Sequence, residues 1–470
     1  MSSERTSELV VIGAGPAGAG SALAAAACGV EVTLLDENRR AGGQVYRAPT
    51  PGLPVGAGPD HAIGERLRRE LAESPVRQAF GRRVWNVGPG LDIAAMGPDG
   101  PEVWQARHLI VATGTVERVV PFPGWTEPGV IGVGAATLLL KSQAMLPGQQ
   151  TLIAGSGPLL FAAAAGILKG GGEVAGVIDC ARKRDWLQRM PTLAARPDLV
   201  RRGLSWLALI RRAGVPILHA HTVTRANRVG DRLTITVAAV GGGRPERYFE
   251  VDALAVGHGL TPASEITRLL RLDHDFDAAR GGWIAVQDAF MRSSRPDVSV
   301  AGDGSGIAGA AAALLQGRIA GLAAAHALGQ LGDAALARQV RPLVSTLRRA
   351  ERFGHAMAAL MHPPTSLIDA IPPETIICRC EDITRAEIES AIAAGAREVN
   401  QLKAWTRCGM GPCQGRICGE TVADLVAHHA GGRVRAGIFT ARPPLRPIAL
   451  DMLTGIYDYA HIPVPPAAPP

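Results

Sequence analysis

The sequence predicts an α/β protein in which two strand–turn–helix units of the same kind precede a small helical C-terminal domain. A β-branched run ends at Gly13-Ala14-Gly15 and leads into an Ala-rich stretch, and the same order recurs around Gly155-Ser156-Gly157. Five of the seven cysteines lie within 378–418. A chain of 470 residues has room for about three domains, at roughly 150 residues each.

Composition and charge exclude several classes of protein. Hydrophobic residues make up 47% of the chain and charged residues 19%, which excludes a chain that is disordered throughout. The 49 Lys and Arg outnumber the 42 Asp and Glu, and no long basic run concentrates the excess. The pI of about 9.3 predicts anionic partners. Aromatic residues are only 4%, too few for nucleic-acid stacking platforms, so we expect no nucleic-acid partner.

Two uncharged stretches, 9–30 and 142–168, are long enough to cross a bilayer. Each contains a Gly-x-Gly-Pro turn, which predicts strand, turn and helix rather than one continuous span. The N-terminus, with Glu4, Arg5 and Glu8, lacks the positive region of a signal peptide. We therefore expect a cytoplasmic chain without a transmembrane segment, which leaves peripheral membrane contact open.

The first unit has the order of a Rossmann dinucleotide site. The strand 9–12 is followed by Gly13-Ala14-Gly15-Pro16-Ala17-Gly18, a helix to Cys28, and a second strand that ends in Asp36-Glu37. Gly13 permits the turn, Gly15 lets the backbone approach a pyrophosphate, and Gly18 lets helix and strand close up. The helix N-terminus faces the phosphate charge, and Asp36 would accept hydrogen bonds from the ribose hydroxyls. The alternative is a tight glycine turn in an ordinary α/β core.

The second unit keeps the fold pattern and departs from the binding pattern. The strand 151–154 leads into Gly155-Ser156-Gly157, a helix to Lys169 and a strand that ends at Asp179. Leu160 occupies the position of the third glycine, so NAD(P) binding is doubtful and a retained scaffold is the alternative. Asp179 would favour NAD over NADP because a carboxylate repels a 2'-phosphate.

Three later segments are predicted apolar strands that are followed by small residues: His108 to Gly114, Val251 to Gly259, and Val298 to Gly304. The last of these runs into Asp303, at a strand end that points toward a cofactor, and precedes a helix from Ile307 to about Leu328. His258, in Gly257-His258-Gly259, is the most tempting single catalytic candidate, although a turn histidine near a cofactor is more often structural.

This order resembles flavoproteins with two dinucleotide-binding domains, the class of glutathione and thioredoxin reductases. The resemblance covers residues 8 to about 330 and implies that the second domain is inserted in the first, that Asp303 bonds the ribityl chain of FAD, and that Gly43-Gln44 passes near the flavin. No Cys follows Gly42-Gly43 and no C-x-x-C lies in the second domain, which argues against a dithiol reductase. The expected cofactor-binding residues are Gly13, Gly15, Pro16, Ala17, Gly18, Asp36, Glu37, Gly43, Gln44, Thr113, Gly114, Gly302 and Asp303.

The cysteine cluster is the most specific pattern in the chain. Cys378-Arg379-Cys380 is followed by Cys408, Cys413 and Cys418, a set suited to an iron–sulfur cluster or to zinc. The tight C-x-C pair favours iron and sulfide over zinc, whose structural sites usually use C-x-x-C, and an unmetallated thiol group is the third alternative. Gly409 and Gly411 would let backbone N–H groups turn toward bridging sulfides.

The segment resembles the bacterioferritin-associated ferredoxin domain. That resemblance implies a 2Fe-2S cluster held by Cys378, Cys380, Cys408 and Cys413, with Cys418 as a spare thiol. Arg379, Arg407 and Arg416 would favour the reduced cluster, or else form a solvated basic surface. Cys28 and Cys180, on apolar elements, are expected in the core.

The helix 384–394 opens with a capping box, Thr384-x-x-Glu387, and ends at Gly395. Prolines between Met361 and Pro373 indicate a stiff linker, and those after Arg442 an extended surface tail. The expected organisation is an FAD (adenine-nucleotide) domain at 1–120 and 275–345, a second, NAD(P)-binding-like domain at 121–274, a linker at 346–373, a 2Fe-2S domain at 374–430 and a Pro-rich tail at 431–470.

The combined pattern of Gly42 to Arg47 and Thr406 to Arg416 resembles one family over about residues 8 to 450: the electron-transfer subunits of opine oxidase, hydrogen cyanide synthase and the hydroxyproline and proline dehydrogenases. The resemblance implies an oxidoreductase subunit that passes electrons from an FAD-containing, amino-acid-oxidase-like partner to an acceptor. It also implies, for some members, a small 2Fe-2S subunit, FMN at the partner interface, or another adenine nucleotide in the first site. The alternatives are a self-sufficient NAD(P)H oxidoreductase and a non-catalytic redox or iron-responsive binding module.

Overall fold

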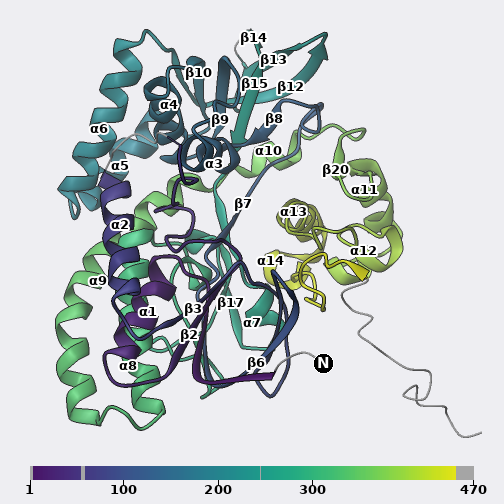
Figure 1. Ribbon diagram of the computed structural model, residues 1–470. Coiled ribbons are helices and arrows are strands. Elements are labelled where there is room, and N and C mark those ends of the chain that lie inside the picture. Colours follow the sequence, from purple (N-terminus) through teal and green to yellow (C-terminus); the bar gives the residue numbers. More distant parts are fainter. Residues whose placement is uncertain (1–3, 54–58, 244, 451–470) are drawn as a thin grey trace, which may run out of the picture.

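The computed structural model describes residues 4–53, 59–243 and 245–450 (Figure 1). Its first domain is built on a twisted sheet in which β1 runs parallel to β2 on one side and to β6 on the other. The strand order is β3-β2-β1-β6-β5-β4, with β19 parallel to β6. The strands are β1 (Glu4–Ile12), β2 (Val32–Asp36), β3 (Arg77–Phe80), β4 (Arg83–Val87), β5 (Asp92–Gly97), β6 (Gly100–Val111) and β19 (Val298–Val300).

The second domain is inserted in the first, as the sequence predicts. The chain leaves through β7 (Thr115–Glu117) and returns through β16 (Leu260–Pro262), which pair antiparallel. The inserted sheet has the order β11-β10-β9-β15-β8, and a separate sheet has the order β12-β13-β14. The strands are β8 (Val130–Gly132), β9 (Gln150–Gly155), β10 (Glu173–Asp179), β11 (Ile217–His219), β12 (His221–Val229), β13 (Arg232–Ala239), β14 (Arg247–Val251) and β15 (Ala253–Gly257).

The boundary expected at residue 274 lies earlier in the structure. Helix α7 (Glu265–Leu269) follows β16 directly, and its buried Ile266, together with Leu270 and Leu272, packs in the core that holds Leu109 of the first domain. These apolar side chains have a core to enter as soon as the chain has crossed back. The first domain therefore resumes near residue 260, and the short hairpin β17 (His274–Asp277) and β18 (Gly282–Ala285) belongs to it.

Small residues explain the uncharged stretch at the N-terminus. Helix α1 (Pro16–Ala26) packs closely on α8 (Ala310–Ala327), because added Cβ atoms at Gly317 and Gly321 would overlap the carbonyls of Ala17 and Ser21. The stretch is thus a strand, a turn and a buried helix. The remaining helices of the two domains are α2 (Pro59–Ala72), α3 (Val133–Gln143), α4 (Leu159–Lys169), α5 (Lys183–Leu193) and α6 (Pro197–Arg212).

The expected linker at 346–373 is only partly a linker. Its residues 346–361 are the C-terminal half of the long helix α9 (Asp333–Met361), which packs against α8 and α5. Buried apolar residues at helical spacing, including Leu347, Ala350 and Met357, pack in two cores and hold this segment as a helix. Only the proline-rich part after Met361, with the short α10 (Thr365–Asp369), is a connection.

The C-terminal domain is small and mainly helical. The capping box is confirmed: Thr384 Oγ1 accepts the N–H of Glu387, whose Oε2 accepts the N–H of Thr384 at 2.8 Å. Part of the expected tail packs on the protein, since Leu445 is buried, and residues 451–470 lie outside the described residues. The elements are β20 (Ile376–Cys378), β21 (Ile383–Thr384), α11 (Arg385–Ala393), α12 (Val399–Thr406), α13 (Gly419–Ala430) and α14 (Arg433–Ala436).

Within residues 4–53, 59–243 and 245–450, no helix combines the length and the apolar character that a bilayer crossing needs.

Candidate functional site

The first glycine turn has the geometry of a nucleotide cradle. Gly13 has φ +102°, and Gly18 lies so close to Gly13 that an added Cβ would overlap its carbonyl oxygen. Gly15 caps α1, whose first residue is Pro16, and an added Cβ at Gly15 meets nothing closer than the Cα of Gly43 at 3.8 Å. The backbone at Gly15 is therefore accessible at a helix N-terminus, where phosphate charge is stabilised.

The acid at the end of β2 lies beside this turn. Asp36 Oδ2 accepts the Ala14 N–H at 2.6 Å, and Oδ1 accepts the Asn38 N–H at 2.7 Å. The side chain is only partly buried, so its oxygens keep lone pairs for a ribose hydroxyl. Glu37 is half exposed and lies 3.7 Å from Arg83. Of the two acids, Asp36 lies at the turn.

Arg47 joins this group, although the sequence pattern did not single it out. Its guanidinium donates to Asn38 Oδ1 and, at 2.9 Å, to Gln44 Oε1. Burial lowers its pKa, and its buried Nε has no partner among the described residues. A partly buried guanidinium with a spare Nε–H donor beside a phosphate cradle fits an anionic ligand. The only sequence signal for it is its position three residues after Gln44.

The segment Gly42-Gly43 lies on the cradle, because the added Cβ of Gly43 would be 2.8 Å from the Cα of Gly15. On the far side of the same sheet edge, Asp303 Oδ1 accepts the N–H groups of Ala308 and Gly309 at 2.9 and 2.8 Å. Its Oδ2 has no partner in the described part of the chain, and burial raises the pKa of this carboxyl. That free oxygen fits a hydroxyl of a bound cofactor.

The remaining expected residues of the first site support this edge. Thr113 Oγ1 donates to Ala263 O at 2.7 Å, so it ties the first crossover to the return of the chain. Gly114 and Gly302 both have positive φ, and Ala17 lies where a Cβ on Gly302 would collide at 2.7 Å. The structure thus gathers the expected cofactor residues along the carboxyl edge of the parallel strands β1, β2, β6 and β19.

The second glycine turn is covered by the chain itself. An added Cβ at Gly157 would be 2.6 Å from the Cγ of Met361, and one at Gly259 would be 2.6 Å from the carbonyl oxygen of Met361. Only a void of about 10 Å³ remains there, lined in part by Ser156 and Leu160. The end of α9 therefore occupies the space in front of this turn.

The acid of the second unit, Asp179, forms hydrogen bonds with other groups of the protein. Asp179 is fully buried and accepts hydrogen bonds from the Ala181 N–H at 3.0 Å and from Trp186 Nε1 at 2.9 Å. His219 Nδ1 lies 3.0 Å from Oδ2, the same oxygen that accepts from Trp186. The carboxylate that would bind a ribose is thus committed to protein donors.

His258 lies near a separate cavity of about 510 Å³ between β12, the crossing at Pro121-Phe122-Pro123 and α10. Its Nδ1 accepts the Val120 N–H at 3.1 Å, and burial lowers its pKa to about 3. The ring is therefore neutral and holds the crossing segment. This is a structural position, in agreement with the more common role of a turn histidine.

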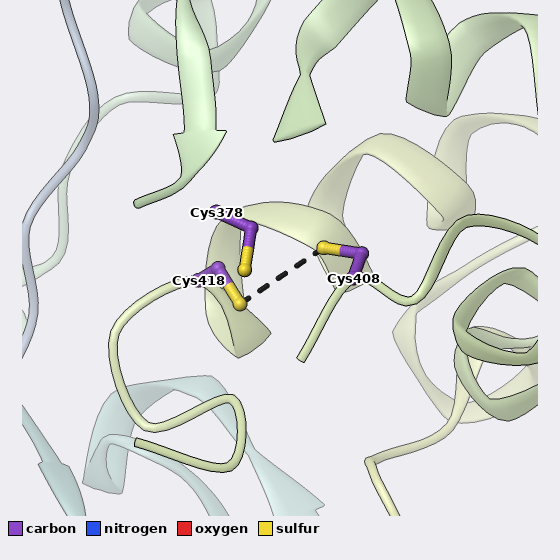
Figure 2. A group of neighbouring side chains, drawn as sticks. All are labelled: Cys378, Cys408 and Cys418. Atoms are coloured by element: carbon purple, nitrogen blue, oxygen red, sulfur yellow. Dashed lines mark hydrogen bonds between the residues drawn. The ribbon is translucent and has the colours of Figure 1, made fainter. Parts of the chain in front are cut away.

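The cysteine domain brings three thiols together at its centre (Figure 2). The Sγ atoms of Cys378, Cys408 and Cys418 all lie within 4.8 Å of one another, and those of Cys408 and Cys418 are 4.0 Å apart. Cys378 ends β20, Cys408 follows α12, and Cys418 caps α13. The resemblance to the bacterioferritin-associated ferredoxin domain implied that Cys418 is a spare thiol, whereas the structure places it within the group.

The other two thiols lie beside this trio. Cys380 is a neighbour of Cys413. Burial raises the pKa of Cys380, and the Cys413 side chain raises it further while the Cys413 backbone N–H lowers it. Hydrogen bonds from Cys408 and Cys418, and the N–H groups of Gly409 and Glu381, hold the pKa of Cys378 far below its ordinary value. Gly411 is needed for close approach, since a Cβ there would overlap the Cβ of Cys380. The donor set, with a thiolate among thiols, suits a thiophilic metal.

The neighbouring arginines bind protein groups. Arg416 pairs with Glu265 and donates to Cys413 O at 3.0 Å, and Arg407 pairs with Glu381 at 3.0 Å. The guanidinium of Arg379 lies 5.6 Å from the ring centre of Trp125. Two of these cations are thus neutralised by acids, and the third stacks on an aromatic ring.

Known protein families match both the dinucleotide-binding part and the cysteine domain of the chain. The pyridine nucleotide-disulphide oxidoreductase family model matches residues 7–329, and the sarcosine oxidase A3 domain model matches residues 373–456. The A subunit of opine oxidase from Rhizobium meliloti (strain 1021) is 34% identical over 96% of this chain and 99% of its own length. Hydrogen cyanide synthase subunit HcnB of Pseudomonas aeruginosa is 33% identical over 93% of this chain and 96% of its own. The chain belongs to the family of HcnB and the opine oxidase A subunit.

More distant relatives share the architecture. The sarcosine oxidase alpha subunit of Corynebacterium sp. (strain P-1) is 27% identical over 95% of this chain, which spans 45% of that longer protein. The crystal structure of L-proline dehydrogenase from P. horikoshii superposes with a TM-score of 0.71 at 21% identity, over 96% of this chain and 80% of that one. This member of the HcnB and opine oxidase family is thus an oxidoreductase with an FAD-binding type of fold.

In this family member the cysteine domain is fixed on both dinucleotide domains. Arg118, which follows β7, forms an ion pair with Asp424 of α13, and Trp125 Nε1 donates to Ile376 O at 2.7 Å. From the first domain, Glu265 accepts from Arg416. The Arg118 and Glu265 side chains are each about 90% buried. Separating a buried ion pair leaves an uncompensated charge, so both pairs oppose displacement of the cysteine domain. The thiol group therefore has a defined place relative to the first cradle.

Proposed function

We propose that this chain is the electron-transfer subunit of a heteromeric amino-acid or amine dehydrogenase, with FAD in the first cradle and a 2Fe-2S cluster on the cysteines. One observation carries the proposal: the open cradle and the thiol group belong to domains that are ion-paired to each other on one chain. A flavin takes up two electrons as a hydride, and a 2Fe-2S centre accepts them singly.

The roles of the chain's own residues follow from their geometry. Gly13, Gly15 and the α1 N-terminus bind the pyrophosphate, and Asp36 the adenosine ribose. Asp303 orients the ribityl chain through its free oxygen, and the partly buried Arg47 adds positive charge near Gln44. Glu37, Pro16, Ala17, Gly18, Gly43, Thr113, Gly114 and Gly302 shape the cradle.

The relatives support the substrate class and the need for a partner. Their names describe an opine oxidase, a hydrogen cyanide synthase, a sarcosine oxidase and a proline dehydrogenase, three of them as subunits. Opines, sarcosine and proline, named in three of the four, are all secondary amines that carry a carboxylate. The oxidising site therefore belongs to a partner with its own FAD, and FMN at the partner interface and a small 2Fe-2S subunit are further expected components, in the cytoplasm.

Five thiols are available for the four ligand positions of a 2Fe-2S cluster. The resemblance to the bacterioferritin-associated ferredoxin domain implies Cys378, Cys380, Cys408 and Cys413, and the proximity of Cys418 to Cys378 and Cys408 makes it a competitor for one of these places. Five single Cys→Ser variants resolve the competition. We expect four of them to lose iron and sulfide and one to retain both.

The main test is to co-purify the chain with the products of neighbouring genes. We expect amine-dependent reduction of an artificial acceptor, with acid extraction releasing flavin together with two irons and two sulfides per chain from the electron-transfer component. The Cys378→Ser variant should assemble and fail to pass electrons. Zinc in place of iron, or absence of flavin, would reject the proposal.

The same material separates the two rival functions. The closed turn at Gly157 gives an NAD(P)H oxidoreductase no support, and NADH should leave the flavin spectrum unchanged. A non-catalytic redox or iron-responsive module would bind the cluster without accepting electrons from a bound flavin. Bleaching by NADH would establish the first rival, and a cluster that stays oxidised during amine turnover would establish the second.

A further inference from the structure

The cavity of about 510 Å³ between β12, the Pro121-Phe122-Pro123 crossing and α10 lies outside the sites assigned above, and is here called the crossing cavity. Its volume is in the range of small-molecule sites. Much of its wall is apolar, formed by Val120, Phe122, Val223, Leu367 and Ile371. The charged side chains among its described lining residues are one cation, Arg225, and one acid, Glu246. The crossing cavity therefore suits an uncharged and mainly apolar molecule.

A buried histidine leaves a hydrogen-bond donor for this cavity. His258 lines the cavity and is only 3% exposed. Its Nδ1 accepts the Val120 N–H at 3.1 Å, which places the proton of the neutral ring on Nε2. Nε2 has no hydrogen-bond partner among the described residues, and it is not one of their fully enclosed polar atoms. This N–H therefore opens on the crossing cavity.

The His258 ring is held in place and carries no charge. Its backbone N–H donates to Arg118 O at 2.7 Å, so main chain and ring are both tied to the crossing segment. Burial lowers the pKa of the ring to about 3, which leaves it neutral near pH 7. The Nε2–H of such a ring donates a hydrogen bond and cannot accept one. A ligand must therefore present an acceptor here, and the carbonyl oxygen of an uncharged molecule fits.

The wall of the crossing cavity is continuous with the core of the cysteine domain. Three lining residues pack in the same hydrophobic core as the three central thiols. The lining residues are Val120, Leu367 and Ile371, and the thiols are those of Cys378, Cys408 and Cys418. The carbonyl of Pro372, which also lines the cavity, accepts the N–H of Thr375 at 3.0 Å. A molecule in the cavity is thus separated from the thiols by the apolar side chains of one core.

We propose that the crossing cavity binds a quinone as the electron acceptor of the electron-transfer function proposed above, on which this inference rests. A quinone is flat, uncharged and mainly apolar, and its carbonyl oxygen can accept the His258 Nε2–H. It takes up two electrons, one at a time, from the redox centre on the cysteines and two protons from water at the cavity mouth. It thereby becomes a hydroquinone, and the centre is oxidised. A protein acceptor is too large for this cavity.

The experiment is isothermal titration calorimetry of the oxidised, cofactor-loaded chain with ubiquinone-1, whose fully substituted ring has no open position for addition of a thiol. We expect saturable binding. His258→Asn keeps a side-chain oxygen for the Val120 N–H and has no atom at the position of Nε2, so Kd should rise by about tenfold. Ala370→Trp fills the cavity from an exposed position on its wall and should raise Kd by about tenfold or more.

The matched control is Ala27→Trp, at an exposed alanine that lines another cavity, of about 680 Å³, between α1, α2, α8 and α9. This variant should bind ubiquinone-1 with the wild-type Kd. Circular dichroism verifies the fold of each variant. Three results would overturn the proposal: no saturable binding to the wild type, wild-type binding by Ala370→Trp, or equal weakening in Ala370→Trp and Ala27→Trp.

Calorimetry is carried out without amine turnover, so this inference and the electron-transfer proposal can fail separately. Amine-dependent reduction of an artificial acceptor by a complex that does not bind ubiquinone-1 would reject the quinone site alone. Zinc in place of iron, with ubiquinone-1 still bound, would reject the electron-transfer function and the acceptor role while retaining the binding site. If both proposals hold, Ala370→Trp should slow amine-dependent reduction of ubiquinone-1 and leave that of the artificial acceptor unchanged.

Discussion

The two glycine turns of this chain share a local structure and differ in what faces them. Each follows a parallel strand, contains glycines at positive φ and opens a helix, α1 or α4. In front of Gly15 the nearest atom to an added Cβ is 3.8 Å away, whereas Met361 lies 2.6 Å from the corresponding point at Gly157. The difference teaches that a Gly-x-Gly turn specifies a fold unit, and that long-range packing decides whether it is a site.

The two acids show the same contrast. Asp36 is partly exposed and retains acceptor capacity, while Asp179 is fully buried among Trp186, His219 and the Ala181 N–H. A carboxylate that is already saturated with donors has little to offer a ribose. The second unit thus has its own residues where the first has room for a ligand.

The largest expected effect is on flavin content. Gly15→Val places a branched side chain in the accessible space at the α1 N-terminus, where its Cβ would be in ordinary contact with the Cα of Gly43 at 3.8 Å, so flavin per chain should fall by about tenfold or more. The corresponding variant Gly157→Val should retain flavin and lose about 3 kcal/mol of stability or more, because it collides with Met361 and places a β-branched residue at a φ of +94°. Absorbance after acid extraction and urea unfolding measure both. Equal flavin loss in the two variants would show that the turns are equivalent.

A buried acid facing the second turn gives the next largest effect. Burial raises the pKa of Glu117 to about 7, from an ordinary 4.5, and its Oε1 accepts the Gly134 N–H at 2.8 Å. The folded state holds this proton more tightly than the unfolded state. Its stabilising contribution is therefore complete below pH 4.5 and is lost as the pH rises to about 7, at a cost of about 3 kcal/mol.

Glu117→Gln retains an acceptor for Gly134 and removes the titration. We expect the free energy of unfolding to fall less between pH 5 and 7 in this variant than in the wild type, as measured by urea titrations. Glu73→Gln, at an exposed carboxylate, should keep the wild-type dependence. Parallel curves for wild type and Glu117→Gln would mean that Glu117 is ionised throughout.

Local sequence predicted the first unit almost completely, because the strand, turn, helix and Asp36 are close in sequence and each carries its own signal. It also predicted the insertion and the capping box at Thr384. The cover over the second turn could not be foreseen, since Met361 comes from a helix distant in sequence whose proline-rich neighbourhood indicated a linker.

Sequence spacing also fails to predict which charged and sulfur-containing side chains lie together in the folded protein. The placement of Cys418 with Cys378 depends on how α13 packs against α11 and α12, and the role of Arg47 depends on Asn38 and Gln44 lying beside it. In each case three-dimensional proximity, which no local pattern encodes, creates the feature.

A smaller effect tests the acids directly. In Asp179→Asn one carboxylate oxygen becomes an amide N–H₂ group, so either Trp186 Nε1 or the Ala181 N–H loses its acceptor in a buried site at a cost of about 2 kcal/mol. Flavin content should not change. Asp36→Asn should have the opposite profile, with weaker flavin retention and little loss of stability, because that site is partly exposed. Thermal unfolding and flavin release distinguish the profiles, and identical profiles would contradict the contrast between the units.

The smallest expected effect comes from substituting Met361, which covers the second glycine turn. Met361 is partly exposed, so Met361→Ala should cost about 1 kcal/mol, below the range for fully buried methionines. Removing its side chain clears the space before Gly157, yet Asp179 stays committed to Trp186 and Leu160 stays in place of the third glycine. We therefore expect no NADH-dependent bleaching of flavin in this variant. If bleaching appears, Met361 alone closes a functional nicotinamide site, and α9 is a plug on an otherwise intact second unit.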